Sequence, residues 1–312
     1  MYSYFTDNKL WGIGGAVLIV LGIFSQVMLD VQINDWYGLF YGQIQSSLTT
    51  PNSVGLIDFY WTLGQFCYLA GAWVVIGVVV KWFASHWVFR WRTAMVTRYH
   101  KIFGQIPVEG ASQRVQEDTL KFARLVEDLG QSLVEALITL VMFFPILYKL
   151  GEPIAEVTGQ AVLIYTAITA AVFGTAALAL IGQRLPGLEY DIQAEEAAYR
   201  KALVVYEDQK ANQSVLTTLY GAVTKVHYRS YFHYLYFNTA RWTYLQGMVI
   251  VPYVVMAPAI VAGIVTLGVV RQIGHAFGQV SRNLQYLVQS WPQVVELLSV
   301  HKRLKEYDRA TK

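Results

Sequence analysis

The 312-residue chain is too apolar for an ordinary soluble domain, because 55% of its residues are hydrophobic and only 14% are charged. Soluble domains carry about 25% charged residues, so much of this surface is expected to face something other than water. The net charge of +3 does not indicate a nucleic-acid partner, and the single cysteine excludes an intrachain disulfide and a cysteine-pair metal site.

Six apolar stretches along the chain predict an all-α membrane protein with six transmembrane helices per subunit. The first four stretches each contain about 20 mostly apolar residues, which is the length of a helix that crosses a bilayer. The first has no small-residue cleavage pattern, so we expect an uncleaved span rather than a signal peptide. The last apolar region is divided at an expected tight outer turn between Pro252 and Pro258. Within a single predicted domain, residues 1–312, the spans are 10–33, 59–83, 129–150, 160–181, 228–251 and 259–298.

The basic residues decide between five and six spans. The segments after the second and fourth spans are rich in lysine and arginine, whereas residues 34–57 contain neither. Basic loops remain on the cytoplasmic side of a membrane, so both rich segments are predicted to be cytoplasmic. The tail is also basic, with Lys302, Arg303, Lys305 and Arg309. An even number of spans returns this tail to the cytoplasm, which favours six.

Carboxylates recur on one face of the predicted helix that follows the fourth span. An α-helix turns by about 100° and rises about 1.5 Å per residue. Glu189, Glu196 and Glu207 are therefore each about 20° from the next, in a row about 27 Å long. Such a row is a candidate set of proton-binding positions. Arg200 lies one turn after Glu196, however, and an ordinary intrahelical ion pair explains that spacing equally well.

A second acidic face precedes and enters the third span. Glu117, Asp128 and Glu135 share a stripe, and Glu127 lies about 80° from it. Glu135 lies well inside the apolar span, where ionisable groups usually mark a functional interior. A carboxylic acid in a low-dielectric cavity holds its proton more tightly than in water, so it can load and release a proton at ordinary pH. Arg124 again offers the alternative of an ion pair with Glu127.

Aromatic and basic residues interrupt the fifth predicted span. Tyr231, Tyr234, Phe237 and Arg241 are candidates for lining a substrate cavity, since aromatic faces accept varied and partly cationic cargo. Interfacial anchoring explains the same aromatic residues equally well. For His275, in the sixth span, we expect a hydrogen-bonded interior histidine rather than a proton carrier.

No catalytic or nucleotide-binding motif is present in the chain. The nearest approach to a phosphate-binding loop, Gly182 to Gly187, continues with Leu188 and Glu189, so its lysine is missing. Because the chain ends soon after the last predicted span, we expect no nucleotide-binding domain. We therefore expect no enzyme activity, no cofactor and no metal.

Several long segments resemble the SbmA/BacA family of bacterial inner-membrane peptide transporters. The strings VFRWRTAM and QRVQEDT are long and unusual, and the matching segments keep the same order over most of the chain. SbmA-like proteins carry an additional hydrophobic region before the segment equivalent to Leu10, whereas this chain begins almost directly at that span. The matching segments are 34–48, 85–95, 109–123, 185–190, 196–201, 231–241 and 258–307.

The resemblance implies an architecture similar to the membrane half of ABC exporters, without the ATPase and with two copies around one large cavity. It also implies uptake of diverse peptides and antibiotics driven by the proton gradient. The family's transport-linked glutamates match Glu117, Glu127, Glu196 and Glu207, and its neighbouring arginine matches Arg114, a candidate for ion pairing or gating. Glu135 and Glu189 rest on the sequence pattern alone.

We therefore expect a homodimeric, proton-coupled importer of peptides and peptide-like antibiotics in the bacterial inner membrane, working by alternating access. Its partners are a second copy, the lipid bilayer, protons and the peptide cargo, with no nucleic acid. Two alternatives remain open at this point: an ABC permease subunit that recruits a separate ATPase, and a membrane scaffold that transports nothing. The natural substrate, the proton stoichiometry and the resting orientation do not follow from the sequence.

Overall fold

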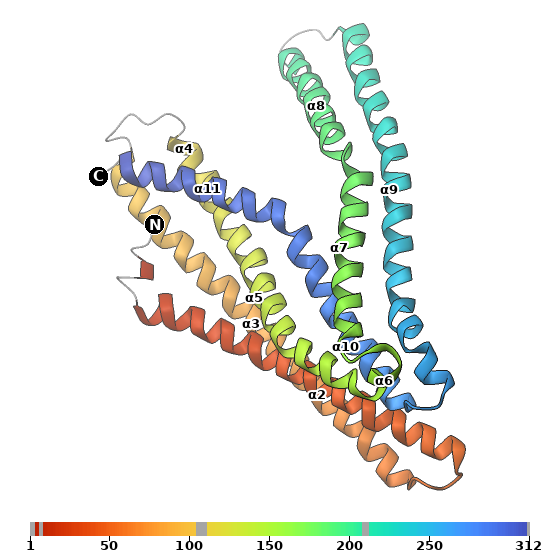
Figure 1. Ribbon diagram of the computed structural model, residues 1–312. Helices are drawn as coiled ribbons and strands as arrows, with labels where there is room; N and C mark the ends of the chain where they lie inside the picture. Colours follow the sequence, from red (N-terminus) through yellow and green to blue (C-terminus); the bar gives the residue numbers. More distant parts are fainter. Residues whose placement is uncertain (1–3, 6–8, 104–110, 208–211, 311–312) are drawn as a thin grey trace. The chain divides into compact units, whose positions relative to one another are not determined.

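The computed structural model describes residues 4–5, 9–103, 111–207 and 212–310, and these ranges contain helices but no strand (Figure 1). The predicted all-α class is therefore confirmed for this part of the chain. The helices are η1 (Leu10–Gly14), α2 (Gly15–Thr49), α3 (Leu56–Ile102), α4 (Ala111–Gln113), η2 (Arg114–Asp118), α5 (Thr119–Leu150), η3 (Glu152–Ile154), α6 (Ala155–Thr158), α7 (Val162–Gly182), α8 (Leu185–Glu207), α9 (Gln213–Val261), α10 (Leu267–Gln289) and α11 (Trp291–Ala310).

Five helical segments of the described chain are long and apolar enough to cross a membrane. They include the first five predicted spans, but most extend far beyond them, as expected for helices that project from a bilayer. The sixth predicted span is not among them, because α10 is amphipathic and α11 is largely polar. A count of six is therefore not confirmed. The five segments are Leu10–Thr49, Leu56–Lys101, Ala111–Thr158, Val162–Gly182 and Gln213–Val261.

The predicted outer turn between Pro252 and Pro258 is wrong. Both prolines lie inside α9, which continues to Val261, and membrane helices tolerate interior prolines. The helix ends instead at Gly263, whose φ of 68° is in the left-handed region. The amide of Gly263 donates to the carbonyl of Ile260 and that of the next residue to Ala259, which is the glycine-terminated ending typical of helices.

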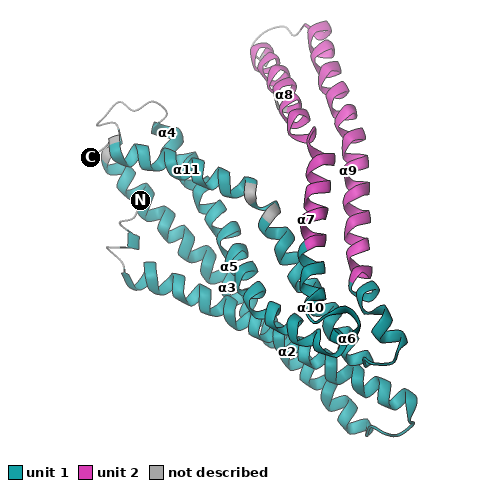
Figure 2. Ribbon diagram, viewed as in Figure 1, with its two compact units in different colours: residues 1–168, 252–312 teal, residues 169–251 magenta. Residues whose placement is uncertain are grey.

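The chain divides into two compact units, which are described separately (Figure 2). Unit 1 comprises residues 1–168 and 252–312, and unit 2 comprises residues 169–251. Unit 1 therefore contains both ends of the chain, and unit 2 is a single inserted stretch that includes α8 and most of α9. The prediction of one domain, which came from the absence of a linker in the sequence, stays a prediction.

In unit 1, α10 packs along α2 and α5. The helices α2 and α10 approach closely at two glycines, since a Cβ on Gly268 would collide with the backbone of Gly38. The start of α10 is capped from α2, because the amide of Leu267 donates to Oε1 of Gln45 at 2.7 Å. The apolar face of α10, which includes Ile273 and Phe277, is buried. An amphipathic helix therefore completes this bundle by covering the neighbouring helices.

A second core of unit 1 joins the end of α3 to the start of α5 and to α11. It is rich in aromatic rings, and Tyr99 of α3 meets Tyr307 of α11 with ring centroids 5.1 Å apart. This core docks the C-terminal helix at the end of the bundle that is predicted to be cytoplasmic. Its buried residues are Tyr4, Trp87, Val88, Trp91, Met95, Tyr99, Val115, Phe122, Ala123, Val300, Leu304 and Tyr307.

Candidate functional site

Unit 1 carries the predicted acidic residues of α5 and of the π-helix η2 that precedes it. Glu117, Asp128 and Glu135 are all exposed. Asp128 and Glu135 lie on the continuous α5, whereas Glu117 lies in the π-helix before it. Asp118, the neighbour of Glu117, is instead 3% exposed. The carboxylates of the acidic stripe therefore point away from the packed core of unit 1, and no other described part of unit 1 covers them.

Glu127 lies on a different face and is half-buried. Its carboxylate is hydrogen-bonded to the hydroxyl of Ser85 on α3, and that hydroxyl also lies 3.1 Å from the carbonyl of Lys81. A serine hydroxyl has a single hydrogen to donate. The Ser85 hydroxyl can therefore donate to the Glu127 carboxylate or to the Lys81 carbonyl, but not to both at once. Glu127 therefore contacts α3 through Ser85, which explains its position without the alternative ion pair with Arg124.

Arg114 belongs to a polar cluster that fastens α11 to η2. The Arg303 guanidinium donates two hydrogen bonds to the buried Asp118 carboxylate, at 2.8 and 3.0 Å. Arg114 donates to the backbone carbonyl of Arg303 at 2.9 Å. Farther along, Lys121 pairs with Glu296 at 2.6 Å, where both side chains are exposed. Arg114 therefore makes a hydrogen bond to the backbone of α11, and its predicted role in ion pairing or gating stays a prediction.

This cluster stabilises the protonated, positively charged form of Arg303. Its pKa is raised, chiefly by the hydrogen bond to Asp118 and also by the charges of Asp118, Glu117 and Glu296. Arginine is already protonated at any physiological pH, so the clamp between η2 and α11 does not open by titration of this residue.

In unit 2, Glu196 of α8 contacts α9. Its Oε1 lies 3.2 Å from Nε2 of His227. Five residues earlier on α8, Asp191 lies 4.0 Å from Arg229, which also belongs to α9. Glu196 is therefore engaged across the two helices, rather than in the ion pair with Arg200 that its spacing along α8 allowed. Glu189 is exposed on the same helix.

Glu207 is the last residue of α8, but its side chain is not among those that the structure describes. The uninterrupted course of α8 from Leu185 confirms the premise of the acidic row, namely that one helix carries all three positions. Glu189 and Glu196 therefore share a face of a single helix.

The four predicted cavity residues share a face of α9. At about 100° per residue, Tyr231, Tyr234, Phe237 and Arg241 lie within an arc of about 120°. Tyr231, Tyr234 and Arg241 are exposed, whereas Phe237 is half-buried because it packs beside Gly182 of α7. The arrangement presents aromatic rings and one cation along a common surface. Such a surface is compatible both with lining a substrate cavity and with anchoring at the membrane interface.

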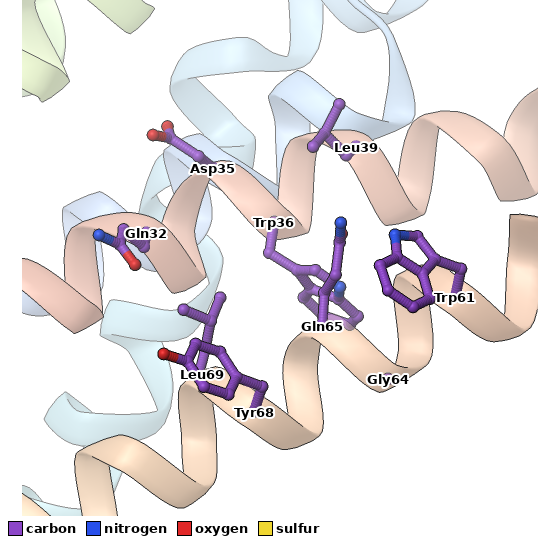
Figure 3. Close-up of a pocket in the computed structure, with 9 residues that line it drawn as sticks. All are labelled: Gln32, Asp35, Trp36, Leu39, Trp61, Gly64, Gln65, Tyr68 and Leu69. Atoms are coloured by element: carbon purple, nitrogen blue, oxygen red, sulfur yellow. The ribbon is translucent and has the colours of Figure 1, made fainter.

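Unit 1 also contains a pocket of about 640 Å³ between α2 and α3 (Figure 3). Trp36, Trp61 and Tyr68 contribute aromatic rings to its wall. The indole of Trp36 is fixed by a 2.7 Å hydrogen bond to the carbonyl of Thr62. Asp35 stands at the rim, and its carboxylate receives a 3.4 Å hydrogen bond from Gln272 of α10. None of the predicted site residues lines this pocket. Its lining residues are Gln32, Asp35, Trp36, Leu39, Trp61, Gly64, Gln65, Tyr68 and Leu69.

His275 occupies the interior position expected for it. Its Nδ1 lies 3.1 Å from Oδ1 of the fully buried Asn34, and the Tyr37 ring lies 5.1 Å from the imidazole. One turn earlier, the Arg271 guanidinium lies 4.7 Å above the ring of Tyr41. These contacts hold α10 against α2 through polar groups in the middle of unit 1.

A family model described as the SbmA/BacA-like family matches residues 6–312, which is nearly the whole chain. The chain belongs to the SbmA/BacA-like family. The resemblance read from the sequence strings is thereby confirmed. Membership and the apolar helices together identify a multi-pass membrane protein of a transporter family.

Curated relatives of this SbmA/BacA-like chain are ABC transporter proteins. The Escherichia coli (strain K12) protein "Inner membrane ABC transporter ATP-binding protein YddA" is 24% identical over 95% of this chain and 56% of its own length. A Synechocystis sp. protein named "Uncharacterized ABC transporter ATP-binding protein sll0182" is 22% identical over 93% of this chain and 46% of its own length. "ABC transporter D family member 2, chloroplastic" of Arabidopsis thaliana is 26% identical over 70% of this chain and 33% of its own length. The chain thus spans about half the length of the first two relatives.

Several contact residues of this SbmA/BacA-like protein did not emerge from sequence reasoning. Ser85 and Glu127 are 42 residues apart, and Glu196 and His227 are 31 residues apart. Helical spacing reveals partners three or four positions away and gives no signal for partners on another helix. The end of α9 at Gly263 could have been predicted from the sequence, because a glycine just after a helix is a standard stop signal.

Proposed function

We propose that this protein is a proton-coupled secondary transporter that imports peptides and peptide-like antibiotics across the bacterial inner membrane. The observation that carries the proposal is the placement of carboxylates on or against membrane-length helices, outside the packed cores. Glu135 is exposed within a candidate span of unit 1, whereas Glu196 lies on α8, which is not a candidate span, and pairs with His227 of α9, which is one. A carboxylate at the depth of Glu135 is costly unless it faces a wet interior.

The expected mechanism is alternating access in a homodimer. Two-fold symmetry is the commonest arrangement of soluble oligomers, and twelve helices can enclose a wider cavity than six. Protonation of the glutamates lowers the cost of removing them from water and so favours one orientation of the transporter. The aromatic arc on α9, with Arg241, is suited to bind peptide side chains by stacking and cation–π contacts.

The test is uptake of a labelled peptide panel into sealed proteoliposomes with an imposed pH gradient. Wild-type protein is expected to accumulate cargo only with the gradient, and glutamine at Glu117, Glu127, Glu196 or Glu207, one at a time, is expected to reduce that accumulation. Wild-type accumulation in all four variants would exclude the glutamates as the coupling groups. Equal uptake with the gradient collapsed would reject proton coupling altogether.

A second candidate function is an ABC permease subunit that works with an ATPase. The observation that favours it is the naming of the curated relatives as ABC transporter ATP-binding proteins, of whose lengths the chain spans about half. This function predicts uptake that depends on ATP and on an added ATP-binding partner. Uptake that persists without ATP and stops with an uncoupler supports the proton-coupled transporter instead.

A further inference from the structure

His227 lies where the acidic residues of α8 meet the aromatic face of α9. Its Nε2 is 3.2 Å from Oε1 of Glu196, and its ring centroid is 6.0 Å from that of Tyr231. Tyr231 in turn meets Tyr228 edge-on at 6.1 Å. One imidazole therefore contacts both a predicted proton-coupling carboxylate and a predicted cargo-binding ring.

Helix geometry places His227 on the same face as the predicted cavity residues. Counting about 100° per residue along α9, His227 falls between Tyr231 and Tyr234 within the arc that also contains Arg241. The side chains of His227 and Glu196 are 32% and 45% exposed, respectively. Both groups are therefore reachable by water, which a proton must use to arrive and leave.

We propose that His227 and Glu196 form one proton-binding pair, with His227 as the member that communicates with bound cargo. This rests on the proposed function. The pair gains one proton when it loads and loses one when it discharges. In the loaded form the imidazolium faces the carboxylate, and in the discharged form the neutral imidazole donates its Nε2 hydrogen to the same carboxylate oxygen. Histidine is the side chain whose charge ordinarily changes between about pH 5 and 8.

Cargo and proton are linked at this pair because the charge of His227 changes next to Tyr231. Cargo that stacks on the aromatic face interacts differently with a charged and a neutral imidazole, and by reciprocity the bound cargo changes the affinity of the pair for its proton. The other charged or titratable groups near the pair in sequence come from α8 and α9. They are Asp191, Glu195, Tyr199 and Arg200 on α8, and Tyr220, Lys225, Tyr228 and Arg229 on α9.

His233 provides a matched control on the same helix. Its Nδ1 lies 2.9 Å from the carbonyl of Arg229 one turn earlier, and its ring neighbours are Phe232 and Tyr236. It is about 120° around α9 from His227. The two histidines thus share a helix but face different surroundings, and only His227 is placed here beside a carboxylate of the acidic row.

The experiment compares wild type, His227→Gln and His233→Gln in proteoliposomes. Glutamine keeps an amide that can hydrogen-bond but cannot take up a proton. Two rates are measured with the same labelled peptide: uptake driven by a pH gradient, and exchange of labelled for unlabelled peptide at equal pH on both sides. Exchange reports whether the protein is folded and moves cargo, whereas gradient-driven uptake also requires proton coupling.

We expect His227→Gln to reduce gradient-driven uptake about tenfold while exchange remains within about twofold of wild type. His233→Gln should leave both rates within about twofold. The double variant His227→Gln, Glu196→Gln should show nearly the same gradient-driven uptake as the less active of the two single variants, because the two residues act as one unit.

Two results would overturn the proposal. One is gradient-driven uptake in His227→Gln that equals that of His233→Gln, and the other is a parallel loss of uptake and exchange in His227→Gln. If His227→Gln cannot be purified as a monodisperse protein, His227→Asn is measured in the same way. If uptake by the wild-type protein does not depend on the pH gradient, the proposed function itself is wrong. Failure of the proposed function can therefore be told apart from failure of the His227–Glu196 proposal.

Discussion

Asp118 and Arg303 form a two-point ion pair across 185 residues of sequence, and the carboxylate side of the pair is 4% exposed. The pair fixes α11, at the C-terminal end of unit 1, to the π-helix that carries Glu117. Its geometry joins both oxygens of the acid to two nitrogens of the guanidinium, which is the strongest arrangement for an arginine–carboxylate pair.

The first prediction concerns this clamp. Arg303→Ala should lower the free energy of unfolding by about 2 kcal/mol, because it leaves the Asp118 carboxylate buried without its partner. Lys121→Ala removes the exposed pair that Lys121 of α5 makes with Glu296 of α11, and should cost no more than about 0.5 kcal/mol. Thermal unfolding in detergent, followed by the fluorescence of the nearby Trp87 and Trp91, measures both. Equal losses of stability in the two variants would contradict the role of Arg303.

The second prediction concerns the approach of α2 and α10. Gly268→Ala should destabilise unit 1 by about 1–3 kcal/mol, because the new methyl group meets the backbone of Gly38, which cannot move aside like a side chain. Gly274→Ala is the control on the same helix, since its methyl group would lie 3.7 Å from the Tyr253 hydroxyl in ordinary contact. It should be neutral or stabilising by up to about 1 kcal/mol. The midpoints of thermal unfolding should therefore move in different directions or by clearly different amounts.

The third prediction concerns the end of α9. Gly263→Ala should cost about 1–2 kcal/mol, because a residue with a Cβ pays that amount in the left-handed region. Gly263→Asn should cost less, since asparagine tolerates this conformation better than other residues. The same unfolding assay ranks the three proteins. An alanine variant as stable as wild type would mean that the turn before α10 is not held in this conformation.

The fourth prediction concerns the contact between Ser85 and Glu127 and rests on the proposed function. Ser85→Ala should reduce gradient-driven peptide uptake about threefold, which is the effect of losing one net hydrogen bond at a coupling group. Ser85→Thr keeps the hydroxyl and should retain most of the uptake. Ser25→Ala is the control, because the Ser25 hydroxyl donates to the carbonyl of Leu21 in its own helix. Uptake by Ser85→Ala at the level of Ser25→Ala would show that the contact does not matter.

Much of the fold was predictable from the sequence, because apolar length and helix periodicity are local properties. The stretches beginning near Leu10 and Phe59 each became part of a membrane-length helix. The error at Pro252 and Pro258 has a physical cause. Proline disrupts an isolated helix, but within a membrane-length helix the loss of one hydrogen bond is tolerated, and the left-handed Gly263 ends α9 instead.

Only part of the candidate site could be predicted from the sequence. The spacing of Glu189 and Glu196 predicted a shared face, and the continuous α8 supports it. The pairing of Glu196 with His227, by contrast, depends on how α9 lies against α8, and no spacing rule within one helix contains that information.

The sequence by itself determined that this chain is helical, membrane-embedded and a member of its family, because composition, apolar length and long unusual strings are properties of the chain alone. Only the tertiary structure decided which acids have partners: Glu127 with Ser85, Asp118 with Arg303, and Glu196 with His227. The reason is that a side chain's partner is set by the packing of helices that are distant in sequence. That packing depends on close contacts such as the one at Gly268, which the residue pattern of a single helix does not encode.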